Sequence, residues 1–167
     1  MAKKKSGFGL GKILSIVAIV LGLVAVCMLF VDAVKVPDTE LLGNTVKGEG
    51  YSGLKVAFGY KEEDTAVFAF SFMGLLPVIL VLAGMVLSGL NAFSKKGSKM
   101  LDYVAMIAFV VAGVLYFIMP SFVVCADTLL GKIAAEIDYV LAVGSIVAAI
   151  CSILAGLAVL AKNLMKK

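Results

Sequence analysis

Four long apolar stretches constrain this chain more than any other feature of its sequence. They cover residues 13–34, 66–93, 104–126 and 139–161. A helix needs about 20 mostly apolar residues to cross the hydrocarbon layer of a bilayer, which is about 30 Å thick. Each stretch is long enough, and with 62% hydrophobic residues the chain has more apolar surface than a soluble fold of 167 residues can bury. The sequence therefore predicts an all-α membrane protein, in which residues 1–167 form one domain built on a bundle of four transmembrane helices.

The lysines divide unequally between the two sides of such a bundle. Ten of the 15 fall on the side that holds both chain ends, and cationic segments resist translocation. That side is therefore predicted to be cytoplasmic, most simply at the plasma membrane. We expect Asp32, Asp102 and Asp138, which lie at the ends of the stretches, to reach headgroups or water. The ten lysines are Lys3, Lys4, Lys5, Lys12, Lys95, Lys96, Lys99, Lys162, Lys166 and Lys167.

The basic start followed by an apolar run also fits a secretory signal. The apolar part of such a signal is only about 7–15 residues long, so we interpret the longer run here as an uncleaved signal anchor, with cleavage near residues 31–33 as the alternative. Nucleic-acid binding is a second interpretation of the basic ends, but lysines that flank a membrane span are the commoner case. We expect the lipid bilayer, and no nucleic acid, as partner. The complete absence of arginine favours a bacterial source with an AT-rich genome.

Small residues recur at helical spacing in three of the stretches. Close backbone approach through small residues supplies much of the attraction between helices in lipid. We therefore predict a helix-packing interface on these faces, either within one chain or between subunits; chance repetition in helices rich in alanine and glycine is the alternative. The predicted interface residues are Gly144, Ala148, Ser152 and Gly156, with Gly84 and Ser88 in the second stretch and Ala18 and Gly22 in the first.

Residues 35–65 form the only sizeable polar segment, which we expect on the extracytoplasmic side. Residues 54–61 alternate between apolar and polar side chains with the two-residue period of a half-buried strand, and residues 44–47 form a weaker extended piece. Glycines at 48 and 50 separate the two, so a small β-hairpin or sheet is predicted. The candidates for contact with a partner are Tyr51, Leu54, Phe58 and Tyr60. Packing of these four side chains onto their own bundle is the alternative.

Two smaller features concern the helices. Asp127 or Thr128 can cap a brief helix over residues 129–137, in the short second connection on the same side. Pro77 lies inside the second stretch, where proline removes a backbone donor and bends a helix. We interpret it as a static kink, with a hinge as the alternative.

Residue types that carry catalysis or hold cofactors are sparse. There is no histidine, and the three cysteines, Cys27, Cys125 and Cys151, form no C-x-x-C pair. A disulfide between Cys27 and Cys125 is conceivable, but three packed thiols are expected. The acidic run 62–64 is interpreted as a solvated edge instead of a calcium site, because spaced ligands are missing. We therefore predict no catalytic residue, no metal and no cofactor, and a protein that is not an enzyme.

The overall plan resembles that of the claudin-type tetraspan proteins: four spans, inside termini, a strand-bearing first outer loop and a very short second one. Gly53-Leu54-Lys55 stands where that family has Gly-Leu-Trp. Lysine replaces the tryptophan, and the loop lacks the paired cysteines of the family. The resemblance implies a fold in which a small outer sheet mediates association, and it carries over no paracellular function.

The chain offers surfaces for recognition but no catalytic groups, which favours a protein that works by association. We predict self-association, as a homo-oligomer, or membership in a larger membrane complex, through the outer loop and the small-residue helix faces. The alternative is an oligomeric channel or transport subunit, in which several copies surround a pathway lined by hydroxyl residues. The candidate lining residues are Ser71, Ser145 and Ser152.

Overall fold

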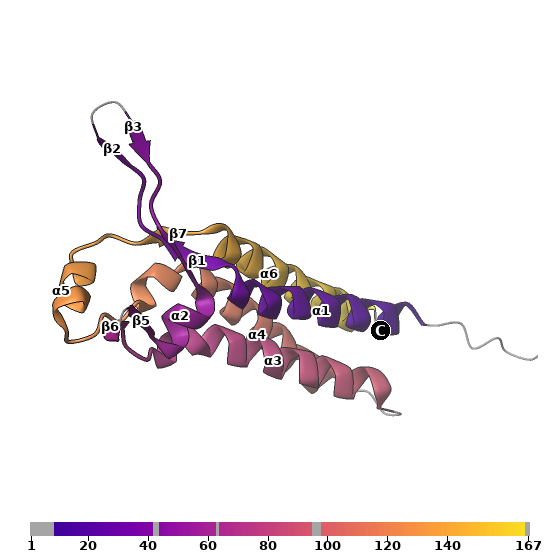
Figure 1. Cartoon of the computed structure of the whole chain (residues 1–167). Helices are drawn as coiled ribbons and strands as arrows, with labels where there is room; N and C mark the ends of the chain where they lie inside the picture. The colour runs from indigo at the N-terminus through magenta and orange to yellow at the C-terminus, as the bar shows by residue number, and fades with distance from the viewer. Residues whose placement is uncertain (1–8, 42–43, 63, 95–97, 166–167) are drawn as a thin grey trace, which may run out of the picture.

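The computed structural model of the chain describes residues 9–41, 44–62, 64–94 and 98–165. Its long helices are α1 (Leu10–Cys27), α3 (Phe72–Phe93), α4 (Lys99–Phe117) and α6 (Val143–Leu164). These four helices are long and apolar enough to cross a membrane, and they lie side by side in one bundle (Figure 1). Helices α1 and α4 each pack against both α3 and α6. The predicted bundle of four helices is confirmed at this level.

The bundle has two different ends. The start of α1, the end of α6 and the junction between α3 and α4 lie together at one end, which we call the terminal end (Figure 1). The segments 28–71 and 118–142 gather at the other end, which we call the loop end, and form a cap there. Helix direction therefore alternates along the chain.

The bounds predicted for the spans are wrong at the loop end. Residues 13–34 do not form one helix: α1 stops at Cys27 and is followed by the 3₁₀ turn η1 (Met28–Phe30) and strand β1 (Asp32–Lys35). The stretch 66–93 begins with strand β6 (Thr65–Phe68), and 139–161 begins with β7 (Val140–Leu141). The stretch 104–126 ends in the 3₁₀ turn η2 (Met119–Phe122). Apolar residues at these edges such as Val34, Phe68 and Met119 are buried inside the cap, and an apolar run alone does not distinguish lipid from a protein interior.

Three small antiparallel sheets make up much of the cap. Strand β1 lies between β4 (Gly50–Ser52) and β7, with Val34 opposite both Tyr51 and Leu141. Strand β5 (Tyr60–Glu62) pairs with β6, and β2 (Thr39–Leu41) pairs with β3 (Asn44–Val46). The predicted small sheet in the first loop is thus confirmed, although β3 pairs with β2 and not with the segment after Gly50.

The strand predicted over residues 54–61 is wrong over most of its length, because residues Gly53–Phe58 form the short helix α2; only Tyr60 and Lys61 lie in a strand, β5. The buried residues of this segment are Gly53, Val56 and Ala57, spaced three and four apart, which is the period of a helix. Over so few residues the same apolar set also matched a two-residue alternation. Helix α2 ends at Gly59, whose φ of 88° lies in the region that favours glycine.

The short helix predicted in the second connection is confirmed as α5 (Leu129–Ala135). Thr128 is its N-cap: its hydroxyl accepts a hydrogen bond from the Gly131 N–H at 3.0 Å and donates to the carbonyl of Ala66 in β6. The cap residue therefore also ties α5 to the sheet. Pro77 lies inside α3, which continues past it to Phe93.

The centre of the bundle is a single large side chain surrounded by glycines. Phe109 of α4 is fully buried. A Cβ atom on Gly84 of α3 would lie 3.0 Å from its ring, and one on Gly22 of α1 would lie 3.2 Å from it. On α6, a Cβ atom on Gly156 would lie 3.4 Å from the Cβ of Phe109. The aromatic ring thus lies in space that Gly22 and Gly84 leave open, and with its Cβ atom against Gly156 the Phe109 side chain contacts all three other helices.

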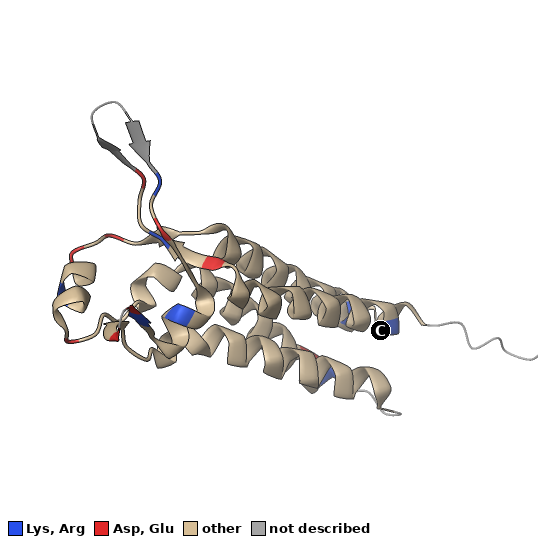
Figure 2. Ribbon diagram, viewed as in Figure 1, with Lys and Arg blue, Asp and Glu red and all other residues tan. Residues whose placement is uncertain are grey.

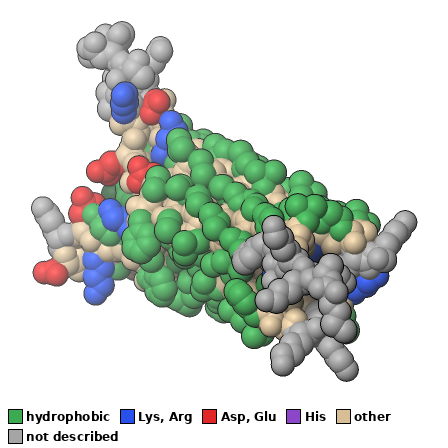
Figure 3. Space-filling view, turned by 90° about the vertical axis from the view of Figure 1, so that its right-hand side faces the viewer, with side chains coloured by type: hydrophobic (Ala, Val, Ile, Leu, Met, Phe, Trp, Pro, Cys, Tyr) green, Lys and Arg blue, Asp and Glu red, His purple; other side chains and the backbone are tan. Residues whose placement is uncertain are grey.

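The surface of the molecule differs between its middle and its two ends. Hydrophobic side chains cover the middle of the molecule in the face shown in Figure 3, whereas charged residues gather toward the two ends (Figure 2). Large apolar side chains such as Val86, Leu90 and Ile107 are more than half exposed on the long helices. Such a belt fits contact with lipid hydrocarbon.

Candidate functional site: a buried ion pair and an outer β arm

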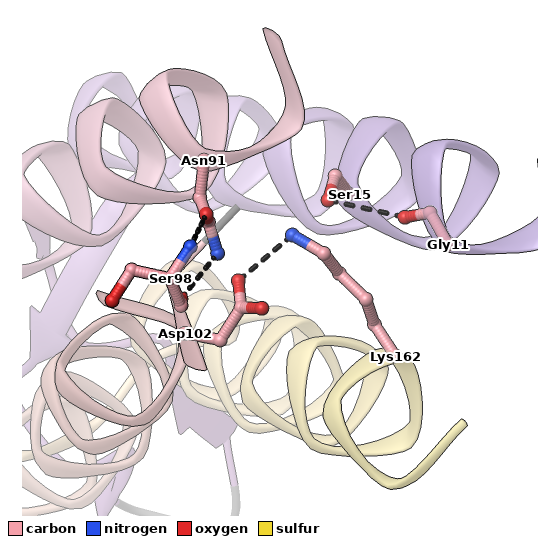
Figure 4. Close-up of polar contacts among 6 residues, drawn as sticks. All are labelled: Gly11, Ser15, Asn91, Ser98, Asp102 and Lys162. Carbon is pink, nitrogen blue, oxygen red and sulfur yellow. Dashed lines mark hydrogen bonds and ion pairs between the residues drawn. The ribbon is translucent and has the colours of Figure 1, made fainter. Parts of the chain in front are cut away.

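A buried ion pair joins two helices at the terminal end. Asp102 lies in the first turn of α4 and Lys162 in the last turn of α6. The Nζ atom of Lys162 is 2.8 Å from Oδ1 of Asp102, and the two side chains are 3% and 0% exposed (Figure 4). An acid at a helix start and a base at a helix end also complement the helix dipoles. The pair therefore ties α4 to α6.

The expectation that Asp102 reaches headgroups or water is wrong. Helix α4 begins at Lys99, five residues before the predicted start of its span, and α6 continues to Leu164, beyond the predicted 161. Both charged groups consequently lie inside the helix packing. The sequence did contain a signal: Asp102 is three residues before the buried Ala105, and Lys162 is three residues after the buried Val159. Each charge therefore extends the buried stripe of its helix.

Polar side chains near the pair come from α1 and α3 and from α6 itself. Asn91, near the end of α3, is buried and binds Ser98, the residue before α4: its Nδ2 donates to the Ser98 carbonyl at 2.8 Å, and its Oδ1 accepts from the Ser98 N–H at 2.7 Å. Ser15 of α1 donates to the Gly11 carbonyl at 3.2 Å (Figure 4). Asn163, next to Lys162, is buried, and neither atom of its amide has a hydrogen-bond partner among the described residues. The terminal end of the bundle thus has polar side chains in its interior, whereas the outer surface of the long helices is apolar.

The eight residues predicted to form the helix-packing interface are all buried between helices of one chain. Gly144 lies against the carbonyl of Asp32 at the loop end, and Gly156 lies against Met106 and Val110 of α4. Gly22 and Gly84 contact Phe109 as described above. The small-residue faces therefore pack against neighbouring segments of the same chain.

The four outer-loop candidates separate into two kinds. Tyr51 and Tyr60 belong to an aromatic cluster with Phe68 and Tyr139, in which the rings of Tyr51 and Phe68 meet edge to face at 4.8 Å between centroids. Leu54 packs against the bundle core. Phe58 differs, because it is 58% exposed.

The aromatic cluster also holds a cation. Nζ of Lys55 lies 4.1 Å from the centroid of the Tyr60 ring, within the range of a cation–π contact. Burial raises the pKa of Tyr51 to about 12, with the Glu49 carboxylate as a second cause, and burial raises that of Tyr139 to about 12. These phenols remain neutral at physiological pH. The cluster accordingly behaves as an apolar core for the cap.

A two-stranded arm is the most prominent part of the loop end. Strands β2 and β3 pair only with each other among the described residues, and the arm stands away from the bundle (Figure 1). Its base is fixed by Asp38, which accepts a hydrogen bond from the Gly48 N–H at 2.9 Å and lies 3.7 Å from Nζ of Lys35. These two contacts hold the pKa of Asp38 below its usual range. Each strand of the arm leaves one edge open to pairing.

Three other predicted features are the cysteines, the acidic run and the flanking lysines. The three cysteines are free thiols, so the chain has no Cys27–Cys125 disulfide, and Cys27 is exposed. In the acidic run 62–64, Glu63 lies outside the described residues, and no group of three metal-binding acidic, histidine or cysteine side chains occurs in the parts of the chain that the structure describes. Seven of the ten flanking lysines also lie outside these parts. They are Lys3, Lys4, Lys5, Lys95, Lys96, Lys166 and Lys167.

The fold and these sites define a class only: a helical bundle with four candidate membrane spans, a buried ion pair at one end and a β-rich cap at the other. Compared with known proteins, the chain matches no family model, no curated protein and no solved structure.

Proposed function

We propose that this chain is an integral membrane protein that works by association, as a homo-oligomer or as a subunit of a larger membrane complex. Both tails lie in the cytoplasm, and the arm lies on the opposite side. The arm supports the proposal most directly, because it extends two strands with open edges away from the bundle. A strand added to such an edge gains main-chain hydrogen bonds, which is a common mode of recognition.

The proposed contact is confined to the loop end. The small-residue helix faces are filled by contacts within the chain, so using them between subunits would require the bundle to open. Of the cap aromatics, Tyr51 and Tyr60 are engaged in the cluster, whereas Phe58 is exposed beside the exposed Phe70 at 6.4 Å between ring centroids. Phe58 therefore remains a candidate contact at the loop end.

The positions of the three candidate serines argue against the alternative of a channel subunit. A pathway between copies would need its hydroxyl lining on the outer surface of each copy. Ser71, Ser145 and Ser152 are all buried inside a single chain. Ser71 is in addition engaged locally, since its hydroxyl donates to the Phe122 carbonyl at 2.7 Å and caps α3.

Removal of the arm tests the proposal. Residues 38–47 are replaced by a two-residue glycine turn, and the full chain and the variant are extracted in mild detergent for measurement of mass and of co-purifying proteins. We expect the full chain to be larger than a monomer and the variant to be monomeric and without companion. The matched control is Leu129→Ser with Ile133→Ser on α5, two exposed residues at the same end. A full chain that is monomeric and alone, or an equal loss in the control, contradicts the proposal.

A further inference from the structure

A cleft of about 260 Å³ opens at the terminal end, beside the buried ion pair. It lies where the start of α1 meets the ends of α3 and α6. A methyl group placed on Gly11 would lie 3.6 Å from Cγ of Lys162, so the lysine stem lies against the first turn of α1. The lining residues are Gly9, Gly11, Lys12, Asn91, Ala92, Ser94 and Lys162.

Lys162, which lines this cleft, has hydrogen-bond donors left over. An ammonium group carries three N–H donors, and the structure gives Lys162 a single partner, Asp102, among the described residues. The side chain is 97% buried, so bulk water reaches it poorly, and a buried donor without an acceptor is costly. An acceptor entering the cleft would satisfy the remaining N–H groups. The lysine therefore points to a ligand that offers oxygens.

The other side of the cleft is also electropositive. Gly9, the N-cap residue of α1, has no side chain to cap the first backbone N–H groups, and the first turn of α1 has no acidic residue. The backbone N–H groups at a helix start and the helix dipole give this end of α1 a partial positive charge. Lys12 adds a full charge at the rim. Asp102 offsets the charge of Lys162, and no acidic residue is among the described residues that line the cleft, so positive charge and donors predominate there.

We propose that this cleft binds a phosphate group. A phosphate carries several acceptor oxygens and a negative charge, which matches the donors of Lys162, Lys12 and the start of α1. The cleft lies at the end of the candidate spans, the level at which phospholipid headgroups would lie. The source of the phosphate is either an anionic phospholipid or a soluble phosphate, and the two are separated by experiment. The site is at the opposite end from the arm and does not depend on the proposed association.

Lipid retention by the purified full chain tests this site. The protein in neutral detergent is titrated with phosphatidylglycerol, phosphatidylcholine or inorganic phosphate, and bound molecules are counted by native mass spectrometry. Lys12→Gln should weaken phosphatidylglycerol binding about fivefold, the change that corresponds to about 1 kcal/mol per lysine near an anionic surface. Gly11→Leu should abolish binding by filling the cleft while every charge is kept. Lys132→Gln, an exposed lysine at the loop end, is the matched control and should bind as the unaltered chain does.

Displacement of phosphatidylglycerol by inorganic phosphate supports the site and identifies a soluble ligand, whereas tight phosphatidylglycerol binding without displacement supports it and identifies a lipid. Equal binding of phosphatidylcholine and phosphatidylglycerol contradicts it. So does an equal loss in Lys12→Gln and Lys132→Gln, which would indicate general attraction to positive charge. Thermal melting shows whether Gly11→Leu is folded; if it is not, Lys12→Gln decides.

Discussion

The ion pair between Asp102 and Lys162 gives the sharpest prediction about stability. Lys162→Met keeps a side chain of similar length but leaves Asp102 without its cation inside the bundle. Because the two side chains are 0% and 3% exposed, water compensates little for the loss. Breaking a buried pair from one side costs about 3–5 kcal/mol, equivalent to at least a hundredfold change in the unfolding equilibrium. Replacing both partners, as in Asp102→Leu with Lys162→Met, should recover most of this loss, since no buried charge is left over.

The assay is reversible unfolding in mixed micelles with increasing sodium dodecyl sulfate, followed by the circular dichroism of the helices. The matched control is Lys132→Met, which breaks a pair at 3.8 Å whose side chains are 73% and 98% exposed and should shift the midpoint negligibly. If Lys162→Met unfolds at the same concentration as the unaltered chain, both groups are solvated and the reasoning fails. A double variant as unstable as the single one refutes it too, because the defect would then not be a buried charge.

Three further predictions concern the core, the cap and the arm. Phe109→Ala should destabilise the bundle by about 3–5 kcal/mol by leaving a cavity, and adding Gly84→Leu should restore part of this in the same unfolding assay; no recovery would contradict the packing described. Tyr51→Ala should loosen the cap and Tyr51→Phe should not, and limited proteolysis of the loop end measures this. An equal increase in cleavage of both variants would show that the hydroxyl group, and not the ring, holds the cap together. Asp38 has a lowered pKa, so its bond to Gly48 should persist at neutral pH and be lost as the pH falls through a midpoint below 3.8; an NMR titration of the Gly48 amide with a midpoint at or above 3.8 would show that the bond is absent.

The number and order of the four long helices could be predicted from the sequence, because a helix that crosses a bilayer needs an apolar run of a known length. The capping of α5 by Thr128 could be predicted as well, since the cap is a local interaction. The ends of the spans could not. Val34, Val67 and Phe68 are as apolar as any residue facing lipid, yet the structure buries them in the cap.

The sites were harder to predict because they depend on contacts between distant segments. Asp102 and Lys162 are 60 residues apart, and their pairing depends on the antiparallel packing of α4 with α6. Phe109 gave no signal of its own, although the glycines that surround it did. For α2, a six-residue segment fitted two periods equally well, and the buried Val56 and Ala57 show which one the fold uses.

The account depends most on the arm and the tails lying on opposite faces of one membrane. In a chain whose three cysteines are replaced by alanine, Glu49→Cys places a thiol at the base of the arm and Lys99→Cys places one at the start of α4, both at exposed positions. A thiol reagent that cannot cross lipid should label Glu49→Cys in intact cells and Lys99→Cys only after permeabilisation. Labelling of both variants in intact cells, or of Lys99→Cys alone, would contradict the threading on which the proposed association is built.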